Sequence, residues 1–508
     1  MPLNLAYPGE LSLAILPELV LFGGAMLLAL WSAWKPESAS HQRSVGLAGL
    51  VLTLVTAALV IVFAMRGYTA DTGPIAIDAF RWAADLILLL SAAIALAMGV
   101  EYNARHGIFA AESHVLVLFA TGGMMILAAA RDLMVVFLAF ELMSIAVYVL
   151  AGTNRRNERS AEAALKYFLL GAFAAGFLLY GIALVYGATG TTNIELIGER
   201  IVSEGLGDSR MLLAGMAMLL IGFAFKISAV PFHMWAPDVY EGSPTPIAAY
   251  MAAGVKAGAF AVLMRIWIEA FPDAFLDWHY AVWWLAAITM VIGNVIALQQ
   301  RNVKRMLAYS SIAHSGYLLV ALAAGTPAGS SAFLFYLVSY TLATMGAFAV
   351  VSVAGRDGGE ALTMDSLAGL WKASPWLAGA MAVFMLALLG FPIFGGMGFF
   401  AKWYIIQSAL QSPSPQTRLV VVLVLASVIS AGYYLHVVMV MFMKDRRDDL
   451  PAPARMGGLN RFVIGAAAVI ILIIGIFPDA LATFTRDSAV PAGGAAAQVR
   501  MSSASTSR

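Results

Sequence analysis

Apolar windows of about 20 residues recur along the whole chain, and each is long enough to cross roughly 30 Å of hydrocarbon as an α-helix. Hydrophobic residues make up 61% of the 508 positions and charged residues only 12%, a mix that excludes a soluble domain with an ordinary polar surface. The sequence therefore predicts an all-α integral membrane protein with about fourteen spans. We place them at 11–34, 44–66, 79–100, 113–130, 133–152, 163–188, 211–232, 245–268, 280–299, 306–324, 331–354, 374–401, 418–442 and 460–482.

Several kinds of chemistry are excluded by what the sequence lacks. It has no cysteine, which excludes disulfides, cysteine-ligated iron–sulfur clusters and c-type haem attachment in this chain. It has neither the glycine fingerprint of dinucleotide-binding folds nor a P-loop. A net charge of +1 gives no sign of a nucleic-acid partner. The first window has no basic leader and no small-residue cleavage site, so we expect it to remain as a spanning helix.

The distribution of lysine and arginine predicts an orientation. Loops after odd-numbered spans carry most of the loop cations, whereas loops after even-numbered spans carry few, among which we count Arg81. Because short cytoplasmic loops are enriched in these residues, both termini are expected outside, on the periplasmic side of a bacterial inner membrane. Residues 483–508 are mostly small or polar and are predicted to form a disordered tail.

A few charged residues fall inside the predicted spans. Arg265 lies near a span end and is expected to reach the interface. A lysine at mid-bilayer costs at least about 2.5–3.5 kcal/mol, so it needs a partner, a hydrated cavity or loss of its proton. Glu141 is the deepest carboxylate. The alternative for each residue is a buried ion pair that only fixes helix packing. Four lysines are embedded in this way: Lys166, Lys226, Lys256 and Lys402.

Three further residues are candidates for proton exchange. His314 lies inside a predicted span, flanked by serine and tyrosine, and an imidazole titrates near neutral pH. We interpret His314 as a relay group. His233 is more ambiguous, and Lys304 counts as a loop cation that lies close enough to a span to face inward.

Two spans combine a lysine with a helix-breaking segment. In FKISAVPFHMW, Pro231 follows Lys226, and in LLGFPIFGGMGFFAKWY, Pro392 and neighbouring glycines precede Lys402. Proline removes a backbone donor and clashes with the preceding turn, so spans seven and twelve should break there. Spans four to eight (113–269) and nine to thirteen (279–442) then form two equivalent five-helix units, flanked by residues 1–112 and 460–482. An odd number of helices per unit makes this an inverted repeat, a common sign of a midplane ion path.

These observations suggest a mechanism. We hypothesise that Lys226 holds a proton while Glu141 is ionised beside it. Weakening that pair would release the proton toward Lys256, His314 and Lys402. Neighbouring helices lie about 8–10 Å apart, so water anchored at the broken helices would bridge the gaps.

The segment AFKISAVPFHMWAPDVYEGSPTPIAAYMA, residues 224–252, closely resembles the signature of the antiporter-like proton-translocating subunits of respiratory complex I and of multisubunit cation/proton antiporters. The similarity covers about residues 113–442. Within the family it is best to the N subunits, because M subunits usually carry a glutamate where Lys402 stands, and L subunits continue into a long lateral helix that the residues after 482 could not form. The segment GFPIFGG departs from the family, in which a double proline followed by threonine is expected.

The resemblance implies fourteen spans, termini outside and two inverted five-helix units. It also implies roles for residues: Glu141 as the acidic partner, Lys226 as the lysine of the broken helix, Lys256 as the connecting lysine and His314 as the bridging histidine. Lys402 matches the exit-side lysine and Lys166 a lysine near the first pair. The implied function is proton translocation driven by quinone reduction in other subunits.

The same resemblance implies partners and cofactors. This chain is expected to hold no cofactor and no metal, whereas flavin mononucleotide, iron–sulfur clusters and quinone belong to partner subunits. The expected partners are a neighbouring antiporter-like subunit, small membrane subunits of the same complex and the lipid bilayer. Three alternatives remain open at this point: a sodium/proton antiporter subunit, a stand-alone secondary carrier for an organic solute, and a purely structural subunit.

Overall fold

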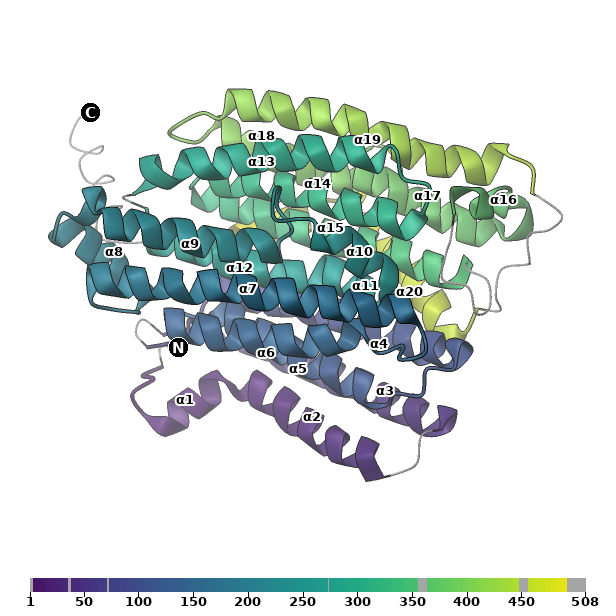
Figure 1. Ribbon diagram of the computed structural model, residues 1–508, viewed down its shortest axis with the longest axis horizontal. Helices are drawn as coiled ribbons and strands as arrows, with labels where there is room; N and C mark the ends of the chain where they lie inside the picture. The colour runs from purple at the N-terminus through teal and green to yellow at the C-terminus, as the bar shows by residue number, and fades with distance from the viewer. Residues whose placement is uncertain are drawn as a thin grey trace.

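The computed structural model describes residues 3–34, 38–70, 73–272, 274–354, 363–446 and 456–490. Within these ranges the chain is helical, and twelve helices are long and apolar enough to cross a membrane. The long helices run roughly parallel across the molecule, with α1 and α8 at the left end of Figure 1 and α16 at the right end. The two remaining predicted spans, seven and twelve, are present as pairs of short helices, so the expected all-α membrane fold is confirmed.

The N-terminal part consists of α1 (Pro8–Ala14), α2 (Leu16–Trp34), α3 (Ala39–Arg66) and α4 (Ala79–His106). Side chains cap the two longest of these helices: the Ser38 side chain accepts a hydrogen bond from the His41 amide, and Asp78 accepts one from the Arg81 amide. Such caps satisfy backbone donors that the first helical turn leaves free. In Figure 1 this part lies at one side of the molecule, with α2 outermost.

The region expected to form the first five-helix unit contains one interrupted helix. Its second helix, α6, has the side chain of Asp132 as its N-cap, and its last element contains a π-helical turn at Met251–Val255, directly before Lys256. A π-helical turn is rare and is often found at functional sites. The elements are α5 (Glu112–Ala129), α6 (Leu133–Ala151), α7 (Glu158–Thr189), α8 (Ile194–Ser203), α9 (Arg210–Lys226), α10 (Trp235–Gly242), α11 (Thr245–Tyr250) and α12 (Lys256–Glu269).

The following region has a similar order, with its own interrupted helix. After it come α20 (Gly458–Ile476) and the short α21 (Asp479–Asp487). In Figure 1, α19 lies at the side of the molecule opposite α2. The elements of this region are α13 (Phe275–Ala297), α14 (Val303–Ala323), α15 (Pro327–Ala354), α16 (Leu370–Ala373), α17 (Pro375–Leu389), α18 (Gly396–Leu410) and α19 (Thr417–Met443).

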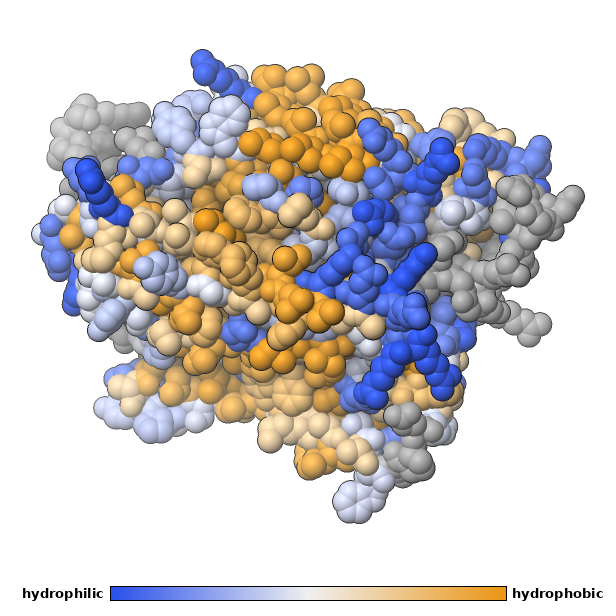
Figure 2. Space-filling model, viewed as in Figure 1, coloured by the Kyte–Doolittle hydropathy of each residue, from blue (hydrophilic) through white to orange (hydrophobic). Residues whose placement is uncertain are grey.

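Burial separates central helices from peripheral ones. The span formed by α11 and α12 is 100% buried within the protein, and α14 and α15 are each 94% buried, whereas α2 is only 22% buried. A polar residue on a central helix is therefore surrounded by protein and not by lipid. Figure 2 shows a broad apolar band over the middle of the molecule with more hydrophilic side chains toward the right end, as expected for a bilayer-spanning surface.

Three sequence-based expectations need correction. The last span ends at Ile476, and α21 continues to Asp487, so residues 483–490 are not part of a disordered tail; the rest of that tail lies outside the described residues. Arg81 belongs to α4 and is buried, although we had counted it as a loop cation. Arg265 is also buried and pairs with Asp78 and Glu269, so it does not extend to an interface.

Candidate proton-transfer site

The first helix break lies between α9 and α10, where the backbone turns out of the helix. Ser228 adopts a left-handed conformation, with φ of 58°, and the Val230–Pro231 peptide bond is cis. The groups freed by the break are bonded by side chains: the Thr289 hydroxyl accepts from the Val230 amide at 2.9 Å, and Ser315 donates to the Ile227 carbonyl at 2.6 Å. The first half of the break, residues 227–230, is therefore buried with these two backbone groups bonded by neighbouring helices, which is the condition for irregular backbone at membrane depth.

Lys226 is the last residue of α9 and is only 1% exposed. Its ammonium nitrogen donates to the Ser144 hydroxyl at 2.8 Å and lies 5.1–5.3 Å from the ring centres of Phe140, Tyr148 and Tyr167. Aromatic faces and the carbonyl end of a helix both attract a cation. The pocket therefore accommodates a charged amine without a carboxylate in contact.

Glu141 and Lys166 are not in direct contact with Lys226. Glu141 lies three residues before Ser144 on α6, is half-buried, and its Oε1 is buried without a hydrogen-bond donor; within the described part of the chain no ion pair joins it to Lys226. Lys166 is 43% exposed and pairs with Glu162 at 2.6 Å and Asp238 at 3.2 Å. Lys226 thus bonds Ser144, and Glu141, which we expected as its direct partner, lies one helical turn away from Ser144 on α6.

Lys256 lies at the centre of the molecule and is 2% exposed. Its ammonium nitrogen donates to the Ser311 carbonyl at 2.8 Å, the Ser311 hydroxyl at 2.6 Å and the Ser315 hydroxyl at 3.0 Å. Three donors meet three acceptors, which is full satisfaction for a charged amine. Ser315 also bonds the first break, so it links Lys256 to the segment that carries Lys226.

His314 is surrounded by tyrosines. Its Nδ1 is 2.6 Å from the Tyr336 hydroxyl and its Nε2 is 3.0 Å from the Tyr434 hydroxyl, while the Tyr340 ring centre lies 4.9 Å away. Tyr340 in turn donates to the Ser311 hydroxyl at 2.8 Å, which connects this group to Lys256. With a hydroxyl at each ring nitrogen, His314 can accept a proton on one side and release one on the other.

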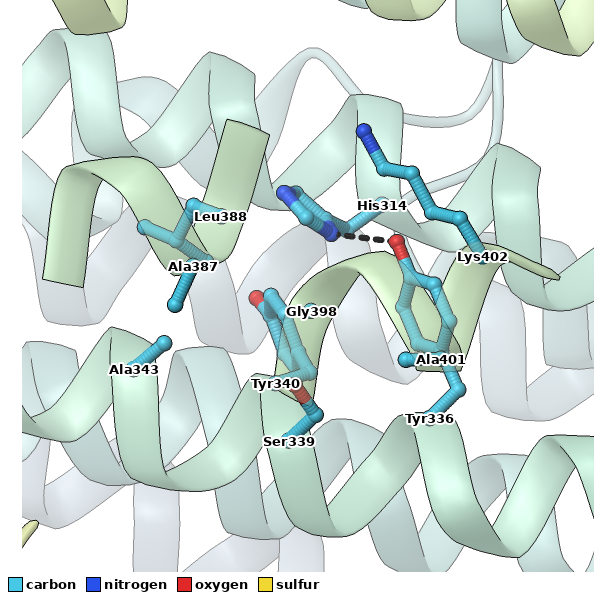
Figure 3. Close-up of a pocket in the computed structure, with 10 residues that line it drawn as sticks. All are labelled: His314, Tyr336, Ser339, Tyr340, Ala343, Ala387, Leu388, Gly398, Ala401 and Lys402. Atoms are coloured by element: carbon cyan, nitrogen blue, oxygen red, sulfur yellow. Dashed lines mark hydrogen bonds between the residues drawn. The ribbon is translucent and has the colours of Figure 1, made fainter. Parts of the chain in front are cut away.

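A small cavity separates His314 from Lys402. It has about 10 Å³ of space for the centre of a water-sized sphere, roughly enough for one water molecule. Figure 3 shows His314, Tyr336, Tyr340 and Lys402 around it, with the bond between His314 and Tyr336 marked. One water here would lie among groups that can exchange a proton with it.

Lys402 lies on α18, just past the second break, and is 7% exposed. Its ammonium nitrogen donates to the Leu389 carbonyl at 2.8 Å and to Ser427 at 3.1 Å, and lies 4.7 Å from the Tyr317 ring centre. Leu389 is the last residue of α17. Both broken helices therefore place a lysine at the carbonyl end of their first half, where the helix dipole favours a cation.

Glycine is required at the second break for two different reasons. Gly390 has φ of 81°, a conformation that other residues rarely adopt. A Cβ on Gly398 would lie 1.8 Å from the Ala387 carbonyl oxygen, so α17 and α18 approach closely only because this side chain is absent. Pro392 lies in the same break and is exposed.

Lys226, Lys256, His314 and Lys402 form a row of ionisable side chains between the two breaks, which we call the lysine row. The remaining candidates, His233 and Lys304, are not among them. His233 follows Pro231 in the first break, with its Nδ1 buried and without a hydrogen-bond partner. Lys304 is buried and donates to the Ser243 carbonyl at 2.7 Å, so it faces inward. Sequence reasoning noted the serines and tyrosines around His314 but did not assign Ser311 and Ser315 to Lys256. It missed Ser144, which had one visible signal, its position three residues after Glu141 on the same helix.

These features define a class: multi-span membrane proteins in which ionisable side chains form a row through the protein interior between two interrupted helices. Among the residues that the structure describes, no group of three or more histidine or carboxylate side chains could hold a metal ion. The row contains amines, hydroxyls and one imidazole, whose shared chemistry is proton exchange.

Comparison with known proteins identifies the family. A family model for the membrane part of NADH:quinone oxidoreductase and Mrp antiporters matches residues 130–430. The chain is 53% identical to the NADH-quinone oxidoreductase subunit N of Gemmatimonas aurantiaca, over 94% of this chain and 93% of the relative. It is 42% identical to the subunit N of Trichlorobacter lovleyi, over 93% and 96%. The chain therefore belongs to the subunit N family of NADH-quinone oxidoreductases.

Solved structures agree. A chain of respiratory complex I from Thermus thermophilus with bound aureothin is 35% identical, with a TM-score of 0.77 over 92% of this chain and 98% of that chain. A chain of the Mrp complex from Dietzia has a TM-score of 0.81 at 21% identity, over 95% and 97%. The latter likeness concerns the fold alone.

Proposed function

We propose that this chain is a proton-translocating membrane subunit of a bacterial NADH:quinone oxidoreductase, in which quinone reduction in other subunits drives protons along the buried row. The observation that carries the proposal is Lys256, a buried amine that is held by hydroxyl and carbonyl groups and, among the residues described, by no carboxylate. A lysine placed only for packing would be costly in this position. An Mrp-type antiporter subunit shares the fold, but the relatives at 53% and 42% identity are both named subunit N of the oxidoreductase.

The proposed path runs from the first break to the second. A proton held at Lys226 passes by way of Ser315 to Lys256, then through Ser311 and Tyr340 to the tyrosine cluster around His314. Hydrogen bonds join Ser315, Lys256, Ser311 and Tyr340 along this path. We propose that water bridges the two remaining steps, from Lys226 to Ser315 and from Tyr340 to the tyrosine cluster. A water molecule in the cavity would complete the route to Lys402.

Glu141 controls the first amine from one helical turn away. Because Lys226 is bonded to Ser144 and not to a carboxylate, its ammonium is held weakly enough for release. A small movement of α6 would bring Glu141 toward the amine or withdraw it, and its charge would retain or release the proton. Lys166 and Asp238 lie at the surface beside this step, where their ion pair joins α7 to α10.

The two five-helix units are proposed to be related by an inverted repeat. Asp132, which caps α6, forms an isolated β-bridge with Asn193 after α7, and Asn302, which caps α14, forms one with Thr363 after α15. Ser144 follows Asp132 by twelve residues, as His314 follows Asn302. The partner of Lys226 thus occupies the position that His314 occupies in the second unit. Matched breaks in such repeats are typical of ion-translocating proteins.

Energy for transport must come from outside this chain. Moving one charge against 100 mV costs about 2.3 kcal/mol. We propose that flavin mononucleotide, iron–sulfur clusters and quinone in partner subunits supply it, and that this chain packs between an antiporter-like subunit and small membrane subunits in the inner membrane. The excess of cations in loops after odd-numbered spans supports an orientation with both termini in the periplasm.

The test is mutation in the assembled complex. Lys226→Ala and Glu141→Ala should each reduce proton translocation and the coupled reduction of quinone by NADH, while the complex still assembles. Lys372→Ala is the matched control, because Lys372 is exposed and pairs with Asp445 at 2.6 Å. Translocation at the wild-type rate by assembled Lys226→Ala complex would remove this residue from the pathway.

A further inference from the structure

A second group of buried charges lies at the start of α4, a helix that packs against α11 and α12. It consists of Arg81 and Asp85 on α4 and Glu18 on α2, with exposed fractions of 0%, 0% and 3%. α2 packs on α5 and α3 at the edge of the molecule, and α4 begins at the end where α1 lies (Figure 1). The group therefore joins the outermost helix to the interior.

Arg81 uses most of its donors on groups other than Asp85. Its guanidinium donates to the Ala76 carbonyl at 3.0 Å, the Ala14 carbonyl at 3.1 Å and Glu18 at 2.6 Å. Asp85 lies 3.6 Å from the Arg81 Nε, which is too long for a hydrogen bond. Both carboxyl oxygens of Asp85 are buried without a hydrogen-bond partner.

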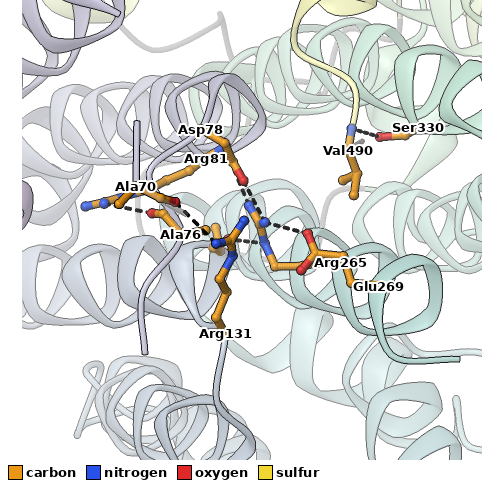
Figure 4. Close-up of polar contacts among 10 residues, drawn as sticks. Ala70, Ala76, Asp78, Arg81, Arg131, Arg265, Glu269, Ser330 and Val490 are labelled. Carbon is orange, nitrogen blue, oxygen red and sulfur yellow. Dashed lines mark hydrogen bonds and ion pairs between the residues drawn. The ribbon is translucent and has the colours of Figure 1, made fainter. Parts of the chain in front are cut away.

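In a neighbouring group of buried residues, the numbers of positive and negative charges are equal. Arg265 donates to both oxygens of Asp78, at 2.7 and 3.0 Å, and to Glu269 at 2.8 Å. Figure 4 shows Arg131 beside this pair, and its charge acts on both carboxylates. Two guanidinium groups thus face two carboxylates, and the charges cancel.

In the group around Arg81, negative charges would outnumber positive ones if both carboxyl groups were ionised. Two carboxyl groups, Glu18 and Asp85, share the single guanidinium of Arg81. The charged groups that act on Asp85 are Glu18 from α2, Arg81 and Asp78 from α4 and its cap, and Arg265 from α12, and the last two are already paired with each other. An ionised carboxylate that is buried, unbonded and left over in the charge balance is strongly disfavoured, and such a group takes up a proton instead.

We propose that Asp85 is a proton-binding site, which holds one proton at neutral pH beside the ion pair of Arg81 and Glu18. Glu18 is assigned as the partner of Arg81 because it receives the short charge-assisted bond, whereas Asp85 receives none. The bound ligand is a proton from the water at that end of the molecule. Within the described part of the chain no hydrogen bond or ion pair joins this site to the lysines, and the proposal does not depend on the proposed function.

The test is infrared spectroscopy of the full chain in lipid vesicles at neutral pH, with aspartate carboxyl carbons labelled with ¹³C. We expect a carboxylic-acid band that moves on labelling and is absent from Asp85→Asn. Asp445→Asn is the matched control and should keep the band, because hydrogen bonding to Lys372 and its charge hold the pKa of Asp445 below its usual range.

A second variant protects the test against a folding defect in the first. In Glu18→Gln, Asp85 is retained but no longer shares Arg81, so Asp85 should ionise and the aspartic-acid band should disappear. Absence of a labelled carboxylic-acid band from the wild-type chain would overturn the proposal. Persistence of that band in Asp85→Asn, or at full intensity in Glu18→Gln, would overturn it equally.

Discussion

Ser311→Ala tests the central link of the row without removing a charged residue. The substitution deletes one hydroxyl that accepts from the Lys256 amine at 2.6 Å and from Tyr340 at 2.8 Å. A hydrogen bond to a charged group contributes about 1.5–3 kcal/mol and a neutral one about 0.5–1.5 kcal/mol. Only the first depends on the proton at Lys256.

The expected loss follows from that bond. A cost of about 1.5–3 kcal/mol to the protonated amine corresponds to a factor of about 10–150 in its population. The Ser311 carbonyl and the Ser315 hydroxyl remain as acceptors, so the lower end applies. We therefore expect proton translocation through this chain to slow about tenfold if loading of Lys256 limits the rate.

The assay compares initial rates of proton translocation in vesicles containing the assembled complex. Ser352→Ala is the control, because Ser352 is likewise a buried serine, but its hydroxyl donates to the Ala349 carbonyl and, in the described part of the chain, bonds no lysine. Equal translocation rates in Ser311→Ala, Ser352→Ala and wild type would refute the argument that this hydroxyl holds the proton at Lys256.

Three further predictions concern structure and the surface. Gly398→Ala should lower the free energy of unfolding by about 1–3 kcal/mol, because the new methyl group meets the Ala387 carbonyl. An unchanged melting temperature would contradict the close packing of α17 and α18 at the second break. Asp78→Asn should cost about 3–5 kcal/mol by leaving Arg265 underbonded, measurable as a lower melting temperature. Burial opposes ionisation of Asp78, but the charge of Arg265 and its hydrogen bonds bring the pKa of Asp78 below its usual value. The stability that the Asp78 carboxylate contributes should therefore be present above about pH 4 and fade on acidification. A stability difference between Asp78→Asn and wild type that does not change with pH would argue against this ion pair. Lys166→Ala should reduce translocation far less than removal of the buried lysine at the first break, since Lys166 is 43% exposed, and an equal loss would place it in the pathway.

The positions of the helices and of both breaks could be predicted from the sequence because apolar length and proline are local signals. Pro231 and the glycines near Pro392 marked the two interruptions, and the structure breaks the helices there. The lysines were conspicuous for the same reason: a charge in an apolar window is visible without knowing the fold.

The partners of those lysines could not be predicted in the same way. Ser144, Ser311 and Ser315 are small polar residues whose importance depends on which helices pack together, a property that hydropathy does not contain. The same limit explains the error for Arg81 and Arg265. The sequence near a helix end does not reveal whether that end is buried against other helices. Arg81 and Arg265 both lie at helix ends that are buried in this way.

The most direct measurement of the central claim is the number of protons translocated per NADH oxidised by assembled complex carrying Lys256→Ala. Removing this amine deletes the ionisable group that bonds both Ser315 and Ser311. The bond that remains, from the Ser315 hydroxyl to the Ser311 carbonyl, contains no ionisable group that can take up a proton and pass it on. A lower ratio, or loss of coupled turnover, with all subunits present is the predicted result. An unchanged ratio at an unchanged rate would contradict proton transfer along the buried row.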